Sequence, residues 1–500
     1  MPPTGLAFTP SSRLASILVL LWALSAMLTG CASTRPAAER QPAIPSQPIP
    51  SVSPFPDLKT RIDGLLPDSL FPPSNVAVMV ISLKDGRTVY ELNPDLLFMP
   101  ASNEKLFTSA AALSILGPDY RFATSVSMDT SNVPQIFLRG GGDPLLSTGD
   151  LDSLAKIVAT ALPHDKTWLL GGDVSLFDDV PWGEGWMWDD EAESDGMAIT
   201  PLSLNGNTVQ IRIRGGNKPG DTLAVRVEPE TGYVTIDNNG FTAGDTAGEP
   251  LKVTRRLTDP SNTIFVTGTI RCGDSASAQI SVHEPVWYAL RVFSERLAGY
   301  GIHCSGTVLD TVPSTARPLC SIYRTLDSVI TNMNRVSDNL SAECLAKTIG
   351  AVRTGSPGSA ASGISAIKQY LAAQAVDTVR MVIADGSGVS RYNLNSVHNI
   401  ATLLQQMHSD QRLFPLFYNS LAAPGEHGSL SNRMKGTSAE GSLRAKTGTL
   451  RGAAALSGYV TTPDGTLLAF SIIMQNYIGN PRRYRQIQDE IAVLLSQWRE

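Results

Sequence analysis

The chain has 500 residues, of which 42% are hydrophobic and 17% are charged, enough apolar sequence for two or three folded domains. Its formal net charge is -6 and it has no long run of lysine or arginine, which argues against a nucleic acid partner. The six histidines show no metal-binding spacing such as H-E-x-x-H, and we expect neither a metal nor an organic cofactor.

The N-terminus has the pattern of an export signal. Arg13 precedes an apolar run from Leu14 to Gly30, and the run ends at Leu28-Thr-Gly-Cys31. This pattern is similar to a bacterial lipoprotein signal, in which cleavage leaves Cys31 as the lipid-bearing first residue. An ordinary secretory signal is the alternative. We therefore assign residues 1–31 to a lipoprotein-type signal peptide, and expect a chain in the cell envelope or periplasm, anchored to a membrane through Cys31.

The next segments read as a tether followed by the start of a folded domain. Residues 32–55 are rich in Pro, Ser and Ala, which is typical of an extended linker. Residues 75–93 predict a β-hairpin, with two strand-like runs around a Lys-Asp-Gly-Arg turn. A helix is predicted from Pro100 to about Leu116, where a Gly-Pro pair follows as a stop signal.

This predicted helix carries a serine and a lysine at a chemically useful spacing. Ser102 and Lys105 are three residues apart, so the lysine amine can reach the serine hydroxyl. If burial or a second cation keeps the amine neutral, it can take the serine proton. Ser102 would also lie at the helix N-terminus, where exposed N–H groups favour negative charge. The same spacing occurs at two other places in the chain, so it proves little alone.

The middle of the chain is rich in strands. Short strand-like runs dominate residues 126–318, separated by turns rich in Gly, Asp and Asn, and only residues 287–300 predict a helix there. We interpret this region as a β-rich insertion of two domains. Trp182, Trp186 and Trp188 could form a sugar-stacking surface, although such aromatic residues more often pack in a core or a loop.

Cysteine usage is compatible with export. Besides Cys31 the chain has four cysteines, which allow three pairings. Cys272 and Cys304 both flank predicted strands and are the favoured disulfide. Cys344 lies in a predicted helix and is expected to be a buried free thiol.

A mixed pattern of helices and strands resumes at residue 319. Residues 328–350 predict a helix interrupted at Ser337-Asp-Asn339, and residues 379–390 predict a strand followed by a Gly-rich turn. Residues 441–476 predict an antiparallel meander. Further helices are predicted at 362–374, 395–408, 414–422 and 484–499.

Three short motifs occur in a fixed order, one at the start of a helix, one at a helix interruption and one on a strand. Together they are the set found in penicillin-binding proteins and β-lactamases. They are Ser102-x-x-Lys105, Ser337-Asp-Asn339 and Lys446-Thr-Gly448.

Longer blocks around these motifs carry a more specific resemblance. PASNEKLFTSAAALSILGPDYRF, LRGGGDPLL, VSDNLSAECLAKTIG, DGSGVSRYN and LRAKTGTLRGAAALSGYV resemble the class C, low-molecular-mass penicillin-binding proteins, which are D-alanyl-D-alanine carboxypeptidases and endopeptidases. The resemblance implies an α/β (α+β) fold: a transpeptidase/β-lactamase-like domain formed by residues 56–125 and 319–500 and interrupted by the insertion.

The resemblance also implies a mechanism. Ser102 would attack a D-Ala carbonyl in a stem peptide of peptidoglycan, with Lys105 as general base, and β-lactam antibiotics would acylate the same serine. Ser337 would pass a proton to the leaving amine. Asn339 would bind the substrate amide and Lys105.

The third motif would bind the far end of the substrate. Lys446, Thr447 and Thr449 would bind the terminal carboxylate or polarise the Ser337 hydroxyl, and Gly448 would leave room for substrate along the strand edge. The N–H groups of Ser102 and Thr449 would form the oxyanion hole. Because each of two lysines in one site disfavours the other's charge, Lys105 could be neutral near pH 7.

Three alternatives remain at this point. A β-lactamase would use the same residues, with Glu104 and Glu343 as the nearest candidates for a deacylating carboxylate. An envelope scaffold or drug sensor would turn over little substrate. An unrelated hydrolase finds no support, because the chain has no G-x-S-x-G motif. The sequence decides neither the balance of carboxypeptidase to endopeptidase activity nor the oligomeric state.

Overall fold

The computed structural model describes residues 56–66, 74–187, 197–244, 248–256, 261–355 and 357–499, all within the unit Ser53–Glu500. The predicted signal segment 1–31 with Cys31, the predicted linker 32–55 and Trp188 lie outside these residues. In the part of the chain that the structure describes, no helix is both long and apolar enough to cross a membrane.

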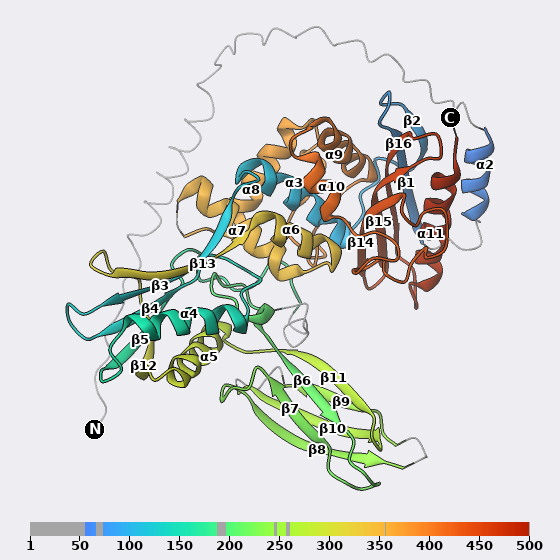
Figure 1. Cartoon of the computed structure of the whole chain (residues 1–500). Helices are drawn as coiled ribbons and strands as arrows, with labels where there is room; N and C mark the ends of the chain where they lie inside the picture. Colours follow the sequence, from blue (N-terminus) through green and yellow to red (C-terminus); the bar gives the residue numbers. More distant parts are fainter. Residues whose placement is uncertain are drawn as a thin grey trace, which may run out of the picture. The chain divides into compact units, whose positions relative to one another are not determined.

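One five-stranded antiparallel sheet joins strands from opposite ends of the described chain (Figure 1). Its strand order is β14-β15-β16-β1-β2, so that β1 (Asn75–Ser82) pairs with β16 (Leu467–Gln475). The remaining strands are β2 (Thr88–Leu92), β14 (Leu443–Leu450) and β15 (Ala453–Thr461). Strand β14, which carries the Lys-Thr-Gly motif, lies at the edge of this sheet.

Both faces of this sheet are covered by helices. Successive side chains of a strand point to opposite faces, so neighbouring residues of one strand belong to different cores. In β1, Met79 packs in the core shared with a layer of helices, whereas Val78 packs in the core shared with α2 (Pro56–Leu65) and α11 (Arg482–Gln497). The helices of the first layer are α3 (Lys105–Ile115), α6 (Leu326–Arg335), α7 (Asn339–Thr354), α8 (Ala360–Ala373), α9 (Val397–Ser409) and α10 (Phe414–Ser420).

The middle of the chain forms three further sheets. A mixed five-stranded sheet has the order β12-β5-β4-β3-β13 and shares a core with two helices; two three-stranded sheets have the orders β8-β10-β9 and β11-β6-β7. Strands β3 and β13 pair antiparallel, which brings the entry to this region beside its exit. The bounds are β3 (Arg121–Asp129), β4 (Gln135–Arg139), α4 (Thr148–Ala161), β5 (Thr167–Asp173), β6 (Thr208–Arg214), β7 (Ala224–Glu228), β8 (Thr235–Ala243), β9 (Lys252–Arg255), β10 (Thr263–Arg271), β11 (Ser275–Ser281), α5 (Pro285–Gly299), β12 (His303–Leu309) and β13 (Arg317–Thr325).

The predicted class of mixed α and β structure is confirmed, as are the first hairpin and the C-terminal meander. The prediction of only one helix in the middle region is wrong, because α4 precedes α5. A capping box was present in the sequence as the signal for α4: the Ser147 side chain accepts from the N–H of Asp150, whose carboxylate accepts from the N–H of Ser147.

A second correction concerns residues 379–383, which form no strand. Val382 makes an isolated bridge with Leu394. The N–H of Ala384 donates to the side-chain oxygen of Asn393 at 2.7 Å, so an asparagine side chain takes the place of a neighbouring strand.

The predicted disulfide between Cys272 and Cys304 is also wrong, since both residues are free thiols. Cys272 follows β10 in one three-stranded sheet, whereas Cys304 belongs to β12 in the mixed five-stranded sheet. Flanking a strand therefore did not make them neighbours. Cys344 is buried in α7 as a free thiol, as predicted.

Candidate active site

The first motif lies in a short turn that leads into a buried helix. Ser102 is half-buried in a 3-10 turn, Ala101–Glu104, and α3 begins at Lys105. Ala101 adopts a left-handed conformation with φ of 49°, uncommon for a residue with a side chain and frequent where local strain serves a site. This turn holds the Ser102 hydroxyl above Lys105.

Lys105 connects three parts of the site. Its side chain is fully buried, and its Nζ lies 3.1 Å from Ser102 Oγ, 2.7 Å from Asn339 Oδ1 and 2.6 Å from the carbonyl oxygen of Ser387. These three oxygen atoms lie within hydrogen-bonding distance and fix the amine next to the serine. The structure thus brings together the first and second motifs.

The second motif lies between two helices. Helix α6 ends at Arg335, Ser337 adopts a left-handed conformation with φ of 68°, and Asp338 caps α7 by accepting from the N–H of Ser341. Because Asn339 is the first residue of α7, its amide projects toward Lys105 from a fixed helix start.

The third motif supplies a second buried lysine. Lys446 on β14 donates to Ser337 Oγ at 2.8 Å and to the carbonyl oxygen of Thr447 at 2.7 Å. Burial, together with the charge of nearby Lys105, holds the pKa of Lys446 well below its ordinary value. The charge of Lys105 thus acts on Lys446, whereas the predicted neutral state of Lys105 stays a prediction.

The rest of the third motif lies along the same strand. Thr447 Oγ1 donates to Ser429 Oγ at 2.8 Å, and Arg485 of α11 donates to Thr449 Oγ1 at 2.9 Å. The structure adds a constraint on Gly448 that was not predicted: an added Cβ would lie 2.9 Å from the carbonyl oxygen of Pro100. The glycine therefore lets the nucleophile turn approach β14.

Neither Ser429 nor Arg485 was predicted from the sequence as a site residue. Ser429 lies in an irregular segment, and Arg485 is one of several arginines at the start of α11. No local signal distinguishes them, because their positions beside the third motif arise only from tertiary packing.

The turn Asp385-Gly-Ser-Gly388 contacts the amine of Lys105 and fixes its position. Asp385 accepts hydrogen bonds from the N–H groups of Gly388 (2.8 Å) and Ser390 (2.7 Å) and from the side chain of Asn393 (2.7 Å). These bonds place the Ser387 carbonyl oxygen against Lys105. The Gly-rich turn predicted after residue 383 therefore lies directly against the first motif.

One support of the turn comes from the middle region of the chain. The indole Nε1 of Trp186 donates to Asp385 Oδ2 at 2.8 Å. The sequence suggested a sugar-stacking surface or, more often for such residues, packing in a core or a loop, and the polar edge of Trp186 is bound to the turn beside Lys105. The loop that carries Trp186 is also held by α7, where Lys347 donates to Asp178 and to the carbonyl oxygen of Val180 in this loop, each at 2.5 Å.

Two buried carboxyl groups lie behind the lysine. Glu104 and Glu343 are both 0% exposed, and within the described residues neither oxygen of Glu104 has a hydrogen-bond partner. Burial and neighbouring Asp385 raise the pKa of Glu104 well above its ordinary value, and raise the pKa of Glu343 to about 7. One oxygen of Glu343 accepts from the N–H of Gly386 at 3.3 Å.

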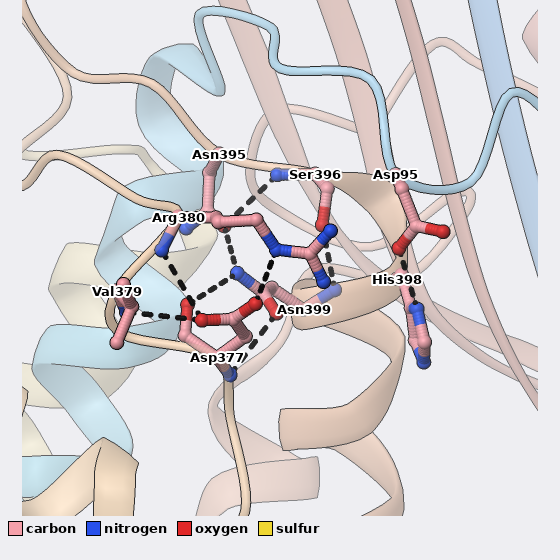
Figure 2. Close-up of polar contacts among 8 residues, drawn as sticks. All are labelled: Asp95, Asp377, Val379, Arg380, Asn395, Ser396, His398 and Asn399. Carbon is pink, nitrogen blue, oxygen red and sulfur yellow. Dashed lines mark hydrogen bonds and ion pairs between the residues drawn. The ribbon is translucent and has the colours of Figure 1, made fainter. Parts of the chain in front are cut away.

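A polar network outside the three motifs fixes the segments that flank the site (Figure 2). Phe98, shortly before the nucleophile turn, exchanges two backbone hydrogen bonds of 2.8 Å with Asn395, which follows the Asp385 turn. Asn399 donates to Asn395 Oδ1 and to the carbonyl oxygen of Asp377, both at 3.1 Å, and Asp377 binds Arg380 at 2.6 Å. The two segments are therefore held together independently of Lys105.

A cavity of about 450 Å³ opens beside the second motif. Its lining includes Met197, Asn332, Val336, Ser337 and Asp338. The cavity places open space next to the Ser337 hydroxyl, where part of a substrate can lie. Across the described residues, no group of three or more His, Cys, Asp or Glu is arranged to hold a metal ion.

Fold and site together define a class of protein. A serine bonded to a lysine three residues later, a Ser-Asp-Asn loop and a Lys-Thr-Gly strand edge, on a sheet covered by helices, are the features of the penicillin-binding serine hydrolases. Residues 58–498 match the model of the family described as the D-Ala-D-Ala carboxypeptidase 3 (S13) family. The chain belongs to this family and is a serine hydrolase.

Individual relatives agree with this assignment. The chain is 33% identical over 467 residues to a D-alanyl-D-alanine carboxypeptidase of Actinomadura sp., a match that covers 88% of this chain and 85% of that protein. It is 24% identical to D-alanyl-D-alanine carboxypeptidase DacB of Haemophilus influenzae, covering 81% and 86% of the two chains.

A solved structure has the same fold. The crystal structure of penicillin binding protein 4 (dacB) from Haemophilus influenzae superposes with a TM-score of 0.75 at 22% sequence identity, covering 87% of this chain and 99% of that chain. The family and the fold confirm the predicted membership among the class C penicillin-binding proteins.

Proposed function

We propose that the chain hydrolyses the D-Ala-containing stem peptides of peptidoglycan through an acyl-enzyme on Ser102. The observation that carries this proposal is the assembly of three distant motifs around one serine. The Lys105 amine lies 3.1 Å from Ser102 Oγ and 2.7 Å from Asn339 Oδ1, and Lys446 of the third motif donates to Ser337 of the second. A lysine within hydrogen-bonding distance of a serine is the arrangement needed to activate that serine as a nucleophile.

The reaction proceeds through acylation and deacylation of Ser102. Ser102 Oγ attacks the carbonyl carbon of the D-Ala residue, and its proton passes to the neutral amine of Lys105. The tetrahedral intermediate collapses with loss of the C–N bond, and the proton held by Lys105 passes through the Ser337 hydroxyl to the leaving amine. Water then hydrolyses the ester, releasing the shortened peptide and restoring Ser102. The N–H groups of Ser102 and Thr449 stabilise the developing oxyanion.

The remaining site residues bind and orient. Asn339 holds Lys105 and the substrate amide. Lys446 polarises the Ser337 hydroxyl, with its amine 2.8 Å away, and together with Thr447 and Thr449 binds the terminal carboxylate. Gly448 lets the nucleophile turn reach the strand edge along which the substrate lies. The reaction uses no metal and no organic cofactor.

Location and organisation are part of the same proposal. We assign residues 1–31 to a lipoprotein-type signal, Cys31 to a lipid anchor and the enzyme to the cell envelope, where its substrate lies. The antiparallel pairing of β3 with β13 supports residues 126–318 as an insertion between 56–125 and 319–500. Fatty-acid labelling of the full chain checks the anchor: Cys31→Ala should abolish it, and equal labelling of the variant would refute lipidation.

The function is tested by intact-mass spectrometry after incubation with a penicillin, for the wild type and Ser102→Ala, followed by an assay of D-Ala release from a pentapeptide stem. We expect a single long-lived adduct on Ser102 that is absent from the variant, and D-Ala release by the wild type only. An unmodified wild type with hydrolysed penicillin would indicate a β-lactamase instead. A stable adduct without D-Ala release would indicate a drug sensor.

A further inference from the structure

A second cavity, separate from the three motifs, lies in the middle region of the chain. It has a volume of about 620 Å³, within the range of small-molecule binding sites, and is lined by the segment after β5, by residues 198–201, by the start of α5 and by residues after β12. Its walls include the buried apolar side chains of Phe177 and Ile199, each 4% exposed. Trp182, which is 37% exposed, and the half-buried Trp287 also line it.

The same cavity carries carboxylates. Asp178, Asp179, Glu284 and Asp310 belong to its lining, and only Asp178 is engaged by a lysine in a described ion pair. Carboxylates accept hydrogen bonds from hydroxyl and amide N–H groups, and their combined charge disfavours an anionic ligand. Aromatic faces offer apolar surface to the C–H faces of a sugar ring. The lining therefore fits a neutral ligand with one apolar face and many hydrogen-bond donors.

We propose that this cavity binds N-acetylhexosamine units of the peptidoglycan glycan strand, with a sugar ring packed on Trp182. The inference rests on the proposed function, because it adds a glycan subsite to an enzyme that cleaves the peptides attached to that glycan. A peptide stem fits this second cavity less well, since stem peptides carry carboxylates that the acidic side chains repel.

The cavity and the active site are linked by one chain segment. Residues 198–201 line it, whereas the preceding residue, Met197, lines the cavity that contains Ser337. Consecutive residues of one segment therefore contribute to both cavities. Peptidoglycan is a branched polymer, in which a peptide leaves the glycan at each muramic acid, so one molecule of substrate can place peptide in one cavity and glycan in the other.

The loop that carries Trp182 is fixed rather than loosely attached. Lys347 of α7 holds it through Asp178 and Val180, and the N–H of Ile199 donates to the carbonyl oxygen of Pro181 at 2.8 Å. Four residues beyond Trp182, Trp186 is bound to Asp385 in the active-site turn. A rigid aromatic platform costs less conformational entropy on binding a sugar than a mobile one.

The test is isothermal titration of the full chain with β-1,4-linked N-acetylglucosamine tetramer, which has the neutral amino-sugar backbone without any peptide. We expect the wild type to bind it and Trp182→Ala to bind at least about tenfold more weakly. Asp179→Asn, a change at an exposed carboxylate, should weaken binding by a smaller factor. Tyr323→Ala, which removes an aromatic ring of 59% exposure on β13, outside the cavity, is the matched control and should bind as the wild type does.

Several results would overturn the glycan site. They are no heat of binding for the wild type at millimolar tetramer, equal binding by the folded Trp182→Ala variant, or slower penicillin acylation in saturating tetramer, which would place the sugar in the active site. The proposed function fails separately: tetramer binding without acylation of Ser102 would leave the glycan site standing while refuting the mechanism.

Discussion

The amine of Lys105 and the side-chain oxygen of Asn339 lie 2.7 Å apart although 234 residues separate them in the chain. This hydrogen bond joins the first motif to the second across the entire middle region. It also competes with Ser102 for the protons of the same amine, so Asn339 helps to decide where the Lys105 amine points.

Asn339→Ala should slow penicillin acylation of Ser102 by about 10- to 100-fold, because a hydrogen bond to a charged group contributes about 1.5–3 kcal/mol. The measurement is the second-order acylation rate, followed by intact mass. Asn239→Ala, at an exposed position of β8, is the control and should acylate at the wild-type rate. Equal rates for the two variants would show that Asn339 does not orient Lys105.

Lys446→Met should reduce activity without reducing thermal stability. Because burial and Lys105 lower the pKa of Lys446, the folded chain binds this proton less readily than the unfolded chain. The free energy of unfolding therefore rises with pH between the lowered pKa of Lys446 and its ordinary pKa of 10.5. Below this pH range the folded chain carries the full cost of charging the buried Lys446. At pH 7 we expect the variant to unfold at or above the wild-type temperature, while acylation falls by at least about 100-fold.

The control for this variant is Lys435→Met, at an exposed position, which should change neither quantity. A clear loss of thermal stability in Lys446→Met at pH 7 would contradict the expected sign, and would mean that the bond to Ser337 outweighs the cost of the buried charge.

Glu343→Gln should flatten the pH dependence of stability between about pH 4.5 and 7. The pKa of Glu343 is raised from 4.5 to about 7, so in this range the folded chain retains a proton that the unfolded chain loses. Stability from this group is full below pH 4.5 and falls as pH rises toward 7, by at most roughly 3 kcal/mol. Urea unfolding at pH 5 and pH 7.5 measures the difference, with the exposed Glu426→Gln as control.

In that experiment, the wild type and Glu426→Gln should lose stability over the interval by similar amounts, and Glu343→Gln should lose less. A wild-type curve that matched Glu343→Gln at both pH values would mean that Glu343 is ionised at the same pH whether the chain is folded or unfolded.

Thiol labelling should distinguish the cysteines. Cys272 is exposed, whereas Cys344 is 0% exposed and burial raises the pKa of its thiol. Iodoacetamide should therefore modify Cys272 first in the native chain and reach Cys344 only after unfolding, as mapped by peptide mass. A peptide pair linked through Cys272 and Cys304 in the unreduced protein would restore the disulfide that the structure contradicts.

The sequence predicted the elements near the motifs well, because those elements carry strong local signals. Adjacent residues carry the signals for the continuous apolar run of β1, the Gly-Pro stop after α3 and the break between α6 and α7. The three motifs and the longer sequence blocks around them indicated the family for the same reason. Helix α4 was missed although its capping box was visible, because its surroundings are dominated by strands.

The supports of the site could not be predicted in this way. Trp186 reaches Asp385 across 199 residues, and Arg485 reaches Thr449 from the last helix. The packing constraint on Gly448 was missed for a related reason, since the carbonyl oxygen that an added Cβ would approach belongs to Pro100 on another element. Such contacts depend on how the helices and strands pack together, which neither the periodicity of apolar residues nor the spacing of motifs indicates.

The pairing of β1 with β16 has a consequence for synthesis of the enzyme. Strand Asn75–Ser82 is made before the whole middle region, but its partner Leu467–Gln475 and the Lys-Thr-Gly strand are made after it. The central sheet therefore cannot close until synthesis has passed β16. A nascent chain that stops earlier has its nucleophilic serine but no assembled site, so it cannot act as a hydrolase.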